Sequence, residues 1–253
     1  MSIVGIVSMK GGVGKTSCTA NLATALARKL DPGCISVVDL DPQNALHWHF
    51  GVNDSKTGVC KHALNGDDWA GVAVATPFGV SCLPYGLVSE SDREAFETLL
   101  AKLPGWLGAK LQQAGLGNNG VVLIDTPPGP SVYLKQMFAC ADLVLIVLLA
   151  DAGSYATIPA MESWLREMLV LRPELNSFYV LNQVDKTQVL NRNVTELLHQ
   201  HLGVRVAPIG IHRDEAVGEA LAFRQPVLVY DPHGQASHDL GGIATWLIDI
   251  LNQ

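Results

Sequence analysis

The stretch Met9-Lys10-Gly11-Gly12-Val13-Gly14-Lys15-Thr16-Ser17 follows an apolar run over Ile3–Ser8 and leads into a helical pattern over Lys15–Leu30. A glycine-rich turn between a strand and a helix lets backbone N–H groups face inward, and the helix N-terminus adds partial positive charge. Lys15 is placed to reach the β- and γ-phosphates of a nucleotide, and the Thr16 hydroxyl to ligate Mg²⁺. We therefore predict a phosphate-binding loop rather than a plain glycine turn. Its nucleotide contacts are expected from Gly11, Gly12, Val13, Gly14, Lys15, Thr16 and Ser17.

Short apolar runs alternate with helical patterns along most of the chain. The expected strands are Ile3–Ser8, Cys34–Asp39, Val121–Asp125, Leu143–Leu149 and Phe178–Asn182. The expected helices are Lys15–Leu30, Asp92–Leu103, Ser131–Cys140, Ile158–Leu171 and Gln188–His201. Strands that are apolar nearly throughout are typical of parallel strands covered on both faces. The alternation predicts an α/β fold with a doubly wound, mostly parallel sheet of the P-loop nucleotide-binding type.

The region Gly51–Gly120 is less regular than the rest. Within it, Val72–Thr76 and Val80–Leu83 flank Pro77-Phe78-Gly79, a pattern that predicts a hairpin at a sheet edge. The sequence contains no internal repeat, low-complexity tract or linker, so we expect a single domain over residues 1–253.

Composition excludes several classes of protein. The chain has 253 residues, 48% of them apolar and 16% charged, which is far from the composition of a disordered protein. A net charge of −7 disfavours a general affinity for nucleic acid or anionic lipid. No apolar run approaches the roughly 18 residues needed to span a bilayer, and no basic residue precedes the first apolar run as in a signal peptide. The five scattered cysteines indicate reduced thiols in a cytosolic protein.

Acidic residues stand where predicted strands end, which is where metal-assisted phosphoryl transfer needs carboxylates. Asp39 and Asp41 straddle the end of the second strand, ahead of Pro42. Asp125 closes the run Val121–Ile124 and is followed by Thr-Pro-Pro-Gly, as the metal-binding aspartate of a P-loop protein would be. Asp41 is also suited to cap a helix after Pro42, and the two roles are compatible.

The loop carries a second lysine, Lys10, near its start, and Met9 stands where the plain motif has glycine. In this it resembles the deviant phosphate loop of the ParA/MinD class of ATPases. The resemblance implies that Lys10 acts in trans, reaching the phosphates bound by the partner in a nucleotide-sandwich dimer. It further implies that Asp41 orients the attacking water, that Asp39 supports the hydration shell of Mg²⁺, and that Asp125 contacts the metal. Lys10, Lys15 and Asp41 are thus the expected catalytic residues, and Thr16, Asp39 and Asp125 the expected metal site.

Base recognition is expected at the end of the strand Phe178–Asn182. Asn182-Gln183-Val184-Asp185 approaches the Asn-Lys-x-Asp pattern that reads guanine, but Gln183 replaces the lysine. Resemblance to the ParA/MinD class implies that Asn182 contacts adenine and that a later loop near Pro208–Ile211, with Pro208 and Ile209 as its contacts, lines the base. ATP is the expected nucleotide, and GTP the alternative.

Three further tracts, Leu64–Trp69, Ile211–Ala216 and Ala222–Val227, are similar to the ParA/MinD-type ATPase of bacterial cellulose biosynthesis, the BcsQ group. The resemblance implies a cytoplasmic, slowly hydrolysing, Mg²⁺-dependent ATPase that forms a homodimer when ATP is bound. Its expected task is the assembly, localisation or regulation of the cellulose synthesis and secretion complex. Protein partners in that machinery would recruit it to the inner membrane.

Two alternatives leave signatures in the C-terminal third. A MinD-like protein would end in a basic amphipathic helix, but no Lys or Arg follows Arg224, so no autonomous membrane anchor is expected. Instead, the apolar spacing over residues 243–251 predicts a helix packed on its own sheet. A DNA-partitioning ATPase should be basic there, yet from Lys186 onward five basic residues face seven acids, which disfavours DNA binding. A metabolic phosphate-loop enzyme is the third reading.

Overall fold

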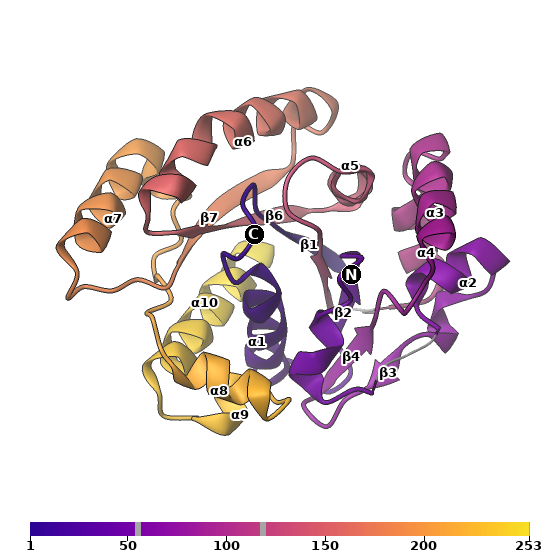
Figure 1. Ribbon diagram of the computed structural model, residues 1–253, viewed down its shortest axis with the longest axis horizontal. Coiled ribbons are helices and arrows are strands. Elements are labelled where there is room, and N and C mark those ends of the chain that lie inside the picture. Colours follow the sequence, from indigo (N-terminus) through magenta and orange to yellow (C-terminus); the bar gives the residue numbers. More distant parts are fainter. Residues whose placement is uncertain (54–56, 117–119, 253) are drawn as a thin grey trace.

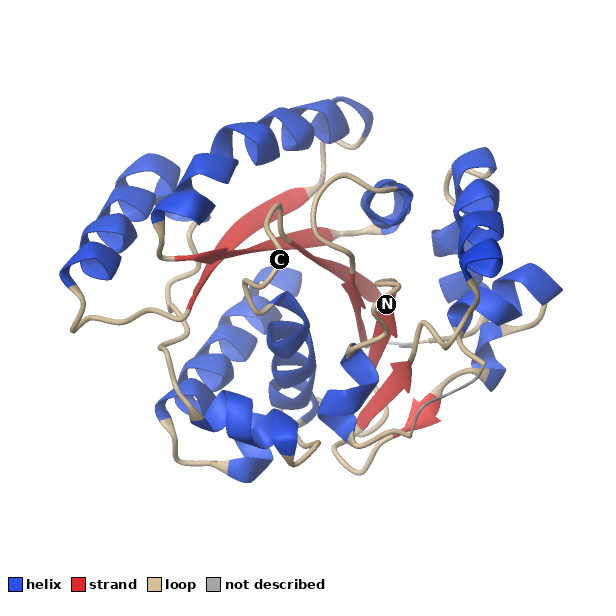
Figure 2. Cartoon of the chain, viewed as in Figure 1, coloured by secondary structure: helices blue, strands red, loops and turns tan. Residues whose placement is uncertain are grey.

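The computed structural model describes residues 1–53, 57–116 and 120–252. Within these ranges a seven-stranded sheet forms the centre of the molecule and helices cover both of its faces (Figures 1 and 2). The strands are β1 (Ser2–Val7), β2 (Ile35–Asp39), β3 (Val74–Ala75), β4 (Val80–Leu83), β5 (Val121–Asp125), β6 (Leu143–Leu149) and β7 (Asn176–Asn182). Their order is β3-β4-β2-β5-β1-β6-β7, and every neighbouring pair is parallel except β3 with β4. The predicted doubly wound α/β fold is confirmed.

Successive strand residues face opposite helical layers, as the two-residue period of a strand requires. Ile3 and Val122 belong to one apolar core, and Val4 and Leu123 to the other. The first core is closed by α2 (Val59–Asn65), α3 (Glu90–Lys102), α4 (Trp106–Gln113), α5 (Val132–Cys140), α6 (Ala152–Leu171) and α7 (Val189–Leu202). The second is closed by α1 (Lys15–Ala27), α8 (Ala216–Ala222), α9 (Val227–Tyr230) and α10 (Gln235–Leu251). Short 3₁₀ turns lie at Leu46–Phe50, Trp69–Gly71 and Gly203–Arg205.

The carboxyl ends of the parallel strands meet at one edge of the sheet. β1 lies between β5 and β6, so the loops after β1 and β5 leave this edge next to each other. Asp39 of β2 is the direct register partner of Asp125 of β5, and Leu149 of β6 is that of Asn182 of β7. A crevice at such an edge, where the strand order reverses, is where open α/β sheets bind ligands.

The predicted elements are present, with shifted ends. The edge hairpin is confirmed as antiparallel β3 and β4, and α10 packs against α1 with Ile243 and Leu247 buried. The helix predicted over Ile158–Leu171 begins instead at Ala152, because the Asp151 carboxylate caps it by accepting from the Ser154 N–H at 2.6 Å. No helix in the described ranges has the length and apolarity needed to cross a membrane.

The irregular region contributes α2, α3 and α4, which lie together at one end of the molecule (Figure 1). They are joined to α5 by a cluster of rings in which Trp69 packs on Trp106, Trp106 on Phe96, and Phe96 on both Tyr85 and Tyr133. The hydroxyls of Tyr85 and Tyr133 are 2.8 Å apart and hydrogen-bonded. The cluster extends the apolar core beyond the sheet to this group of helices.

Candidate functional site

The glycine-rich loop connects β1 to α1 over residues 8–14. Gly12 and Gly14 have φ angles of 76° and 82°, a left-handed conformation that side chains other than glycine rarely adopt. Gly14 is the N-cap residue of α1 and has no side chain, so no capping side chain accepts from the first N–H groups of the helix. A cavity of about 340 Å³ lies against this loop and is lined by its residues together with Asp41, Gln43 and Pro128. Backbone donors, a helix N-terminus and a lysine together suit a phosphate chain.

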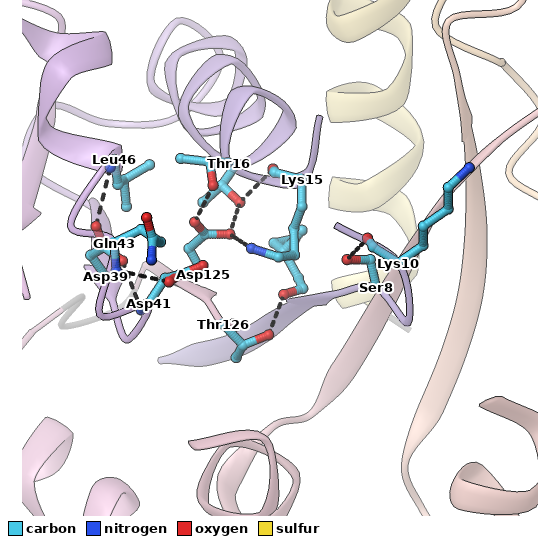
Figure 3. A network of polar contacts seen from close by, with 12 residues as sticks. Ser8, Lys10, Lys15, Thr16, Asp39, Asp41, Gln43, Leu46, Asp125 and Thr126 are labelled. Atoms are coloured by element: carbon cyan, nitrogen blue, oxygen red, sulfur yellow. Dashed lines mark hydrogen bonds and ion pairs between the residues drawn. The ribbon is translucent and has the colours of Figure 1, made fainter. Parts of the chain in front are cut away.

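Three side chains of α1 converge on the carboxylate of Asp125 at the end of β5 (Figure 3). The amine of Lys15 donates to Oδ1 at 2.8 Å, the Thr16 hydroxyl to Oδ2 at 2.7 Å, and the Thr19 hydroxyl to Oδ1 at 3.1 Å. Lys15 and Asp125 are both buried, which strengthens their attraction. The predicted loop lysine, loop threonine and strand-end aspartate therefore form one hydrogen-bonded group.

Asp39 is fully buried beside Asp125, and its side chain is bound by the backbone that follows β2. Its carboxylate accepts from the N–H of Asp41 at 2.9 Å and from that of Leu46 at 3.1 Å (Figure 3). Burial, and next the charge of Asp125, raise the pKa of Asp39 well above its usual range. Asp39 thus fixes the turn after β2, and its place beside Asp125 brings it into the predicted metal site.

Asp41 lines the phosphate cavity. Its Oδ1 accepts from the N–H of Gln43 at 2.9 Å, so the carboxylate closes the turn that follows β2. Burial raises the pKa of Asp41 above its usual value, which makes the carboxylate a better proton acceptor. Asp41 thus lies at the cavity beside the loop, and its predicted role in orienting water stays a prediction.

The loop after β5 is tied to the strand that bears the phosphate loop. Thr126 donates its hydroxyl to the carbonyl of Ile6 at 3.0 Å, and the N–H of Gly129 donates to the carbonyl of Ser8 at 2.8 Å. A displacement of the phosphate loop would therefore move residues 126–129, which lead directly into α5.

Lys10 lines the phosphate cavity, and its side chain extends from the loop toward the start of α6. Its amine lies 2.9 Å from Oδ2 of Asp151, and the two side chains are 41% and 39% exposed. A Cβ atom on Gly153 would come within 2.9 Å of this amine, so a glycine there leaves room for the lysine. Asp151 was not predicted from the sequence, because only the fold brings residue 151 beside residue 10.

A second cavity of about 400 Å³ adjoins the first and shares Gly14 and Ser17 with it. Asn182 lines it, as predicted for a base contact, and its Nδ2 also donates to the carbonyl of Val13 at 2.8 Å. A Cβ atom on Gly14 would lie 2.5 Å from that amide nitrogen, so Asn182 and the loop can approach this closely only with glycine there.

The later loop reaches this cavity with Ile211 and the residues that follow it. Residues 211–215 line it, whereas Pro208 and Ile209 do not. A Cβ atom on Gly242 would meet Cδ1 of Ile209 at 2.4 Å, which places Ile209 against α10 instead. The contact of Pro208 and Ile209 with the base stays a prediction, and residues 211–215 are the part of this loop that lines the cavity. In that stretch His212 is held by buried Asp239. The backbone N–H of His212 donates to Oδ2 of Asp239 at 2.8 Å, and Nδ1 of His212 lies 2.9 Å from the same oxygen.

Thr19 is a site residue that the sequence reasoning missed. It lies four residues after Lys15 and therefore on the same face of α1, a spacing that gives a readable signal once the helix is predicted. His47 and His49, which form a His-x-His pair, are buried behind the first turn after β2 and pack within the fold. Among the described residues, no group of three or more His, Cys, Asp or Glu side chains is arranged to hold a metal ion.

Known proteins similar to this chain fall into related groups. The BcsQ protein of Salmonella typhimurium is 29% identical over 255 residues, which cover 98% of this chain and 94% of that protein. The chromosome partitioning protein ParA of Caulobacter vibrioides is 27% identical, covering 91% of this chain and 88% of the relative.

Two solved structures with the same fold are a protein crystallised with an ATP analogue and a protein named as an ATPase. Cobyrinic acid a,c-diamide synthase of Mycobacterium smegmatis, crystallised with an ATP analogue and magnesium, aligns with a TM-score of 0.82 at 20% identity, covering 100% of this chain and 96% of that one. The cell division ATPase MinD of Pyrococcus furiosus aligns with a TM-score of 0.76 at 22% identity, covering 98% and 99%. The family model described as cellulose biosynthesis protein BcsQ matches residues 1–248. The chain therefore belongs to the BcsQ family, within the wider ParA/MinD group of P-loop proteins.

Proposed function

We propose that this chain is a Mg²⁺-dependent ATPase that alternates between a monomer and an ATP-bound homodimer. The observation that carries the proposal is the convergence of Lys15, Thr16 and Thr19 on buried Asp125, at the start of the helix that follows a loop with two left-handed glycines. Relatives and structural neighbours named as ATPases support the same chemistry.

The phosphate chain is expected to lie in the 340 Å³ cavity against the loop. Backbone N–H groups of the first turn of α1 would bind its oxygens, and the amine of Lys15 would turn from Asp125 toward the terminal phosphates. Because Thr16 and Thr19 also donate to Asp125, the carboxylate keeps hydrogen-bond donors when the lysine turns. The base would enter the adjoining 400 Å³ cavity beside Asn182.

The residues present fit a magnesium ion held together with nucleotide phosphates. Mg²⁺ prefers oxygen ligands and commonly takes only one or two carboxylates besides phosphate and water. The Thr16 hydroxyl and the Asp125 carboxylate, 2.7 Å apart, are the groups that would hold it, with Asp39 adjacent. When bound, the ion would neutralise charge that develops on the phosphoryl oxygens. Each oxygen of Asp39 accepts one backbone N–H and keeps a further lone pair, so its contribution would be electrostatic and through water.

Hydrolysis needs a water placed in line with the terminal phosphate. Asp41 faces the phosphate cavity and has a raised pKa because of burial, so it is the residue that would hold and orient that water. In a single chain Lys10 lines the cavity while its amine is held by Asp151, from which it would be released to act on a partner's phosphates. Two copies joined across their loops would each receive a lysine from the other.

The biological task that we infer is the assembly, localisation or regulation of the complex that synthesises and secretes bacterial cellulose. Membership of the BcsQ family supports it. We infer that protein partners in this complex position the ATPase in the cell, including at the inner membrane. The acidic excess over residues 186–253 supports protein partners over DNA.

The proposal is tested by calorimetric titration of the protein with ATP in the presence of Mg²⁺. A second measurement is cellulose production by cells that lack the gene and are complemented with each variant. The wild type should bind ATP and restore cellulose, Lys15→Ala should do neither, and the surface control Lys29→Ala should do both. Failure of ATP to bind overturns the switch. Binding of ATP without any cellulose defect in the deletion overturns the cellulose role, and tight, salt-sensitive, ATP-dependent binding of duplex DNA would favour the partitioning alternative.

A further inference from the structure

An apolar cavity of about 640 Å³ lies on the face of the molecule covered by α3–α6, apart from both nucleotide cavities. Figure 1 shows α5 between α6 and the group of helices that includes α3. Val132, Gln136 and Ala139, spaced by four and three residues on one face of α5, form the floor. We call this cavity the α5 groove.

The walls of the α5 groove are the C-terminal ends of two helices. Leu100 and Ala101 of α3 form one wall, and Met168 and Leu171 of α6 form the other. Leu171 is 73% exposed, and Leu103, beside the opposite wall, is 48% exposed. Exposed apolar side chains therefore continue beyond the cavity on both sides. Their area is larger than a small molecule within the cavity would cover.

Gln136 holds the groove in shape. Its amide nitrogen, Nε2, donates to the carbonyls of Leu100 and Leu103, both at 2.7 Å. Its Oε1 accepts from the N–H of Leu107 at 3.1 Å. One buried side chain thus connects the end of α3 and the start of α4 to α5. A surface held in this way is present before a partner arrives, which lowers the entropic cost of binding.

One cation is available to a partner at the α5 groove, because Arg172 is already paired with Glu174 and donates to the carbonyl of Ala139 at 2.9 Å. Lys135 and Arg172 line it and no acid does, in a chain whose net charge is −7. The side chain of Lys135 makes no hydrogen bond or ion pair with another residue in the described ranges. Past residues 130–132 a separate hollow bears Glu94 and Glu97, so the basic character ends there.

From this geometry we propose that the α5 groove docks an amphipathic helix of a partner protein, with leucine-like side chains in the groove and acidic residues facing Lys135. A helix is favoured over an extended strand because the walls and floor are themselves helices and offer no unpaired sheet edge. The small side chains of Ala101 and Ala139 let the backbone of such a helix come close.

The docking surface lies next to the nucleotide site in the chain. Pro130 and Ser131 line the groove, and they directly follow residues 126–129, which are bound to the phosphate-loop strand. Docking itself does not require ATP, so the proposal is independent of the ATPase function. A partner held there would nevertheless contact the segment that leads away from Asp125.

The test uses two synthetic peptides of about four helical turns with leucines at i, i+3, i+4 and i+7. One has glutamates flanking the leucines and the other has lysines. Binding to the full chain without nucleotide is followed by fluorescence anisotropy and by methyl NMR of Met168. The glutamate peptide should bind at least about tenfold more tightly than the lysine peptide and should shift the Met168 methyl signal.

Matched variants locate the binding. Leu171→Asp and Lys135→Glu should each weaken the glutamate peptide by about tenfold, whereas Leu190→Asp and Lys186→Glu, on the exposed surface at α7, should leave it unchanged. Thermal melting confirms that all four variants fold. Equal affinity for both peptides, absence of saturable binding up to about 1 mM, or binding that Leu171→Asp does not weaken would overturn the proposal. So would a nucleotide-free dimer that Leu171→Asp dissociates, because a second copy would then occupy the groove.

Discussion

In the single chain, the amine of Lys10 is bound to Asp151 at 2.9 Å, and Asp151 also caps α6 by accepting from Ser154. The lysine that we propose to act on a partner's phosphates therefore has a partner within its own chain. A half-exposed ion pair of this kind contributes at most about 1 kcal/mol, so it can be exchanged for a phosphate contact at little cost.

Removing the charge of Asp151 should favour the dimer. Asp151→Asn keeps an oxygen to cap α6 but loses its attraction for Lys10, so the ATP-bound dimer should form at up to about fivefold lower protein concentration. Gly153→Ala, whose Cβ atom would displace the lysine amine, should act in the same direction. Analytical ultracentrifugation at several concentrations measures both. Weaker dimers in both variants would show instead that the ion pair supports the interface.

Lys15 should stabilise the fold as well as bind nucleotide. Lys15→Ala leaves the buried Asp125 carboxylate without its cation, and the free energy of unfolding should fall by about 3 kcal/mol. The double variant Lys15→Ala/Asp125→Asn should recover much of this loss, because the amide carries no charge. Urea unfolding without nucleotide measures the free energy of unfolding of both single variants and the double variant. Losses of the two single variants that simply add in the double variant would contradict a charge-based coupling.

Asn182 should set the preference for adenine. Asn182→Ala should lower ATP affinity by about tenfold and GTP affinity less, because the amide is expected to contact the base and also holds the carbonyl of Val13. Competition titrations with both nucleotides measure the ratio. Equal affinities of the wild type for ATP and GTP would remove Asn182 as the source of selectivity.

Acid should destabilise the protein through His49. Burial lowers the pKa of His49 from 6.5 to about 4, so below pH 6.5 the unfolded chain takes up a proton that the folded chain refuses. Stability should therefore fall between about pH 6.5 and pH 4. Urea unfolding across this window should show a smaller fall for His49→Gln than for the wild type, and an identical pH dependence would contradict the assignment.

Local sequence was enough to predict the parts of the site that local geometry builds. The loop of residues 9–17 needs only a strand, left-handed glycines and a helix, all of which are visible in the sequence. Asp125 was found because an apolar strand followed by an acid places that acid at the edge of a parallel sheet. Thr19 was equally readable from helical spacing, and was overlooked.

Contacts between distant segments were beyond the sequence. Lys10 meets Asp151 only because β1 and β6 are neighbours in the sheet. Ile209 packs at Gly242 of α10, so the cavity beside Asn182 is lined by residues 211–215 of the later loop and not by Ile209. In the irregular region the sequence predicts the hairpin and the helix over Asp92–Leu103 but not α4, which is stabilised by rings from separate elements, as between Trp106 and Trp69.

The central claim is that ATP joins two chains through Lys10. Sedimentation velocity of Lys10→Ala beside the wild type, each with Mg²⁺ and a non-hydrolysable ATP analogue, tests it most directly. We predict a dimer for the wild type and a monomer for Lys10→Ala, even when the variant is saturated with the analogue. A Lys10→Ala dimer as stable as that of the wild type would contradict the account.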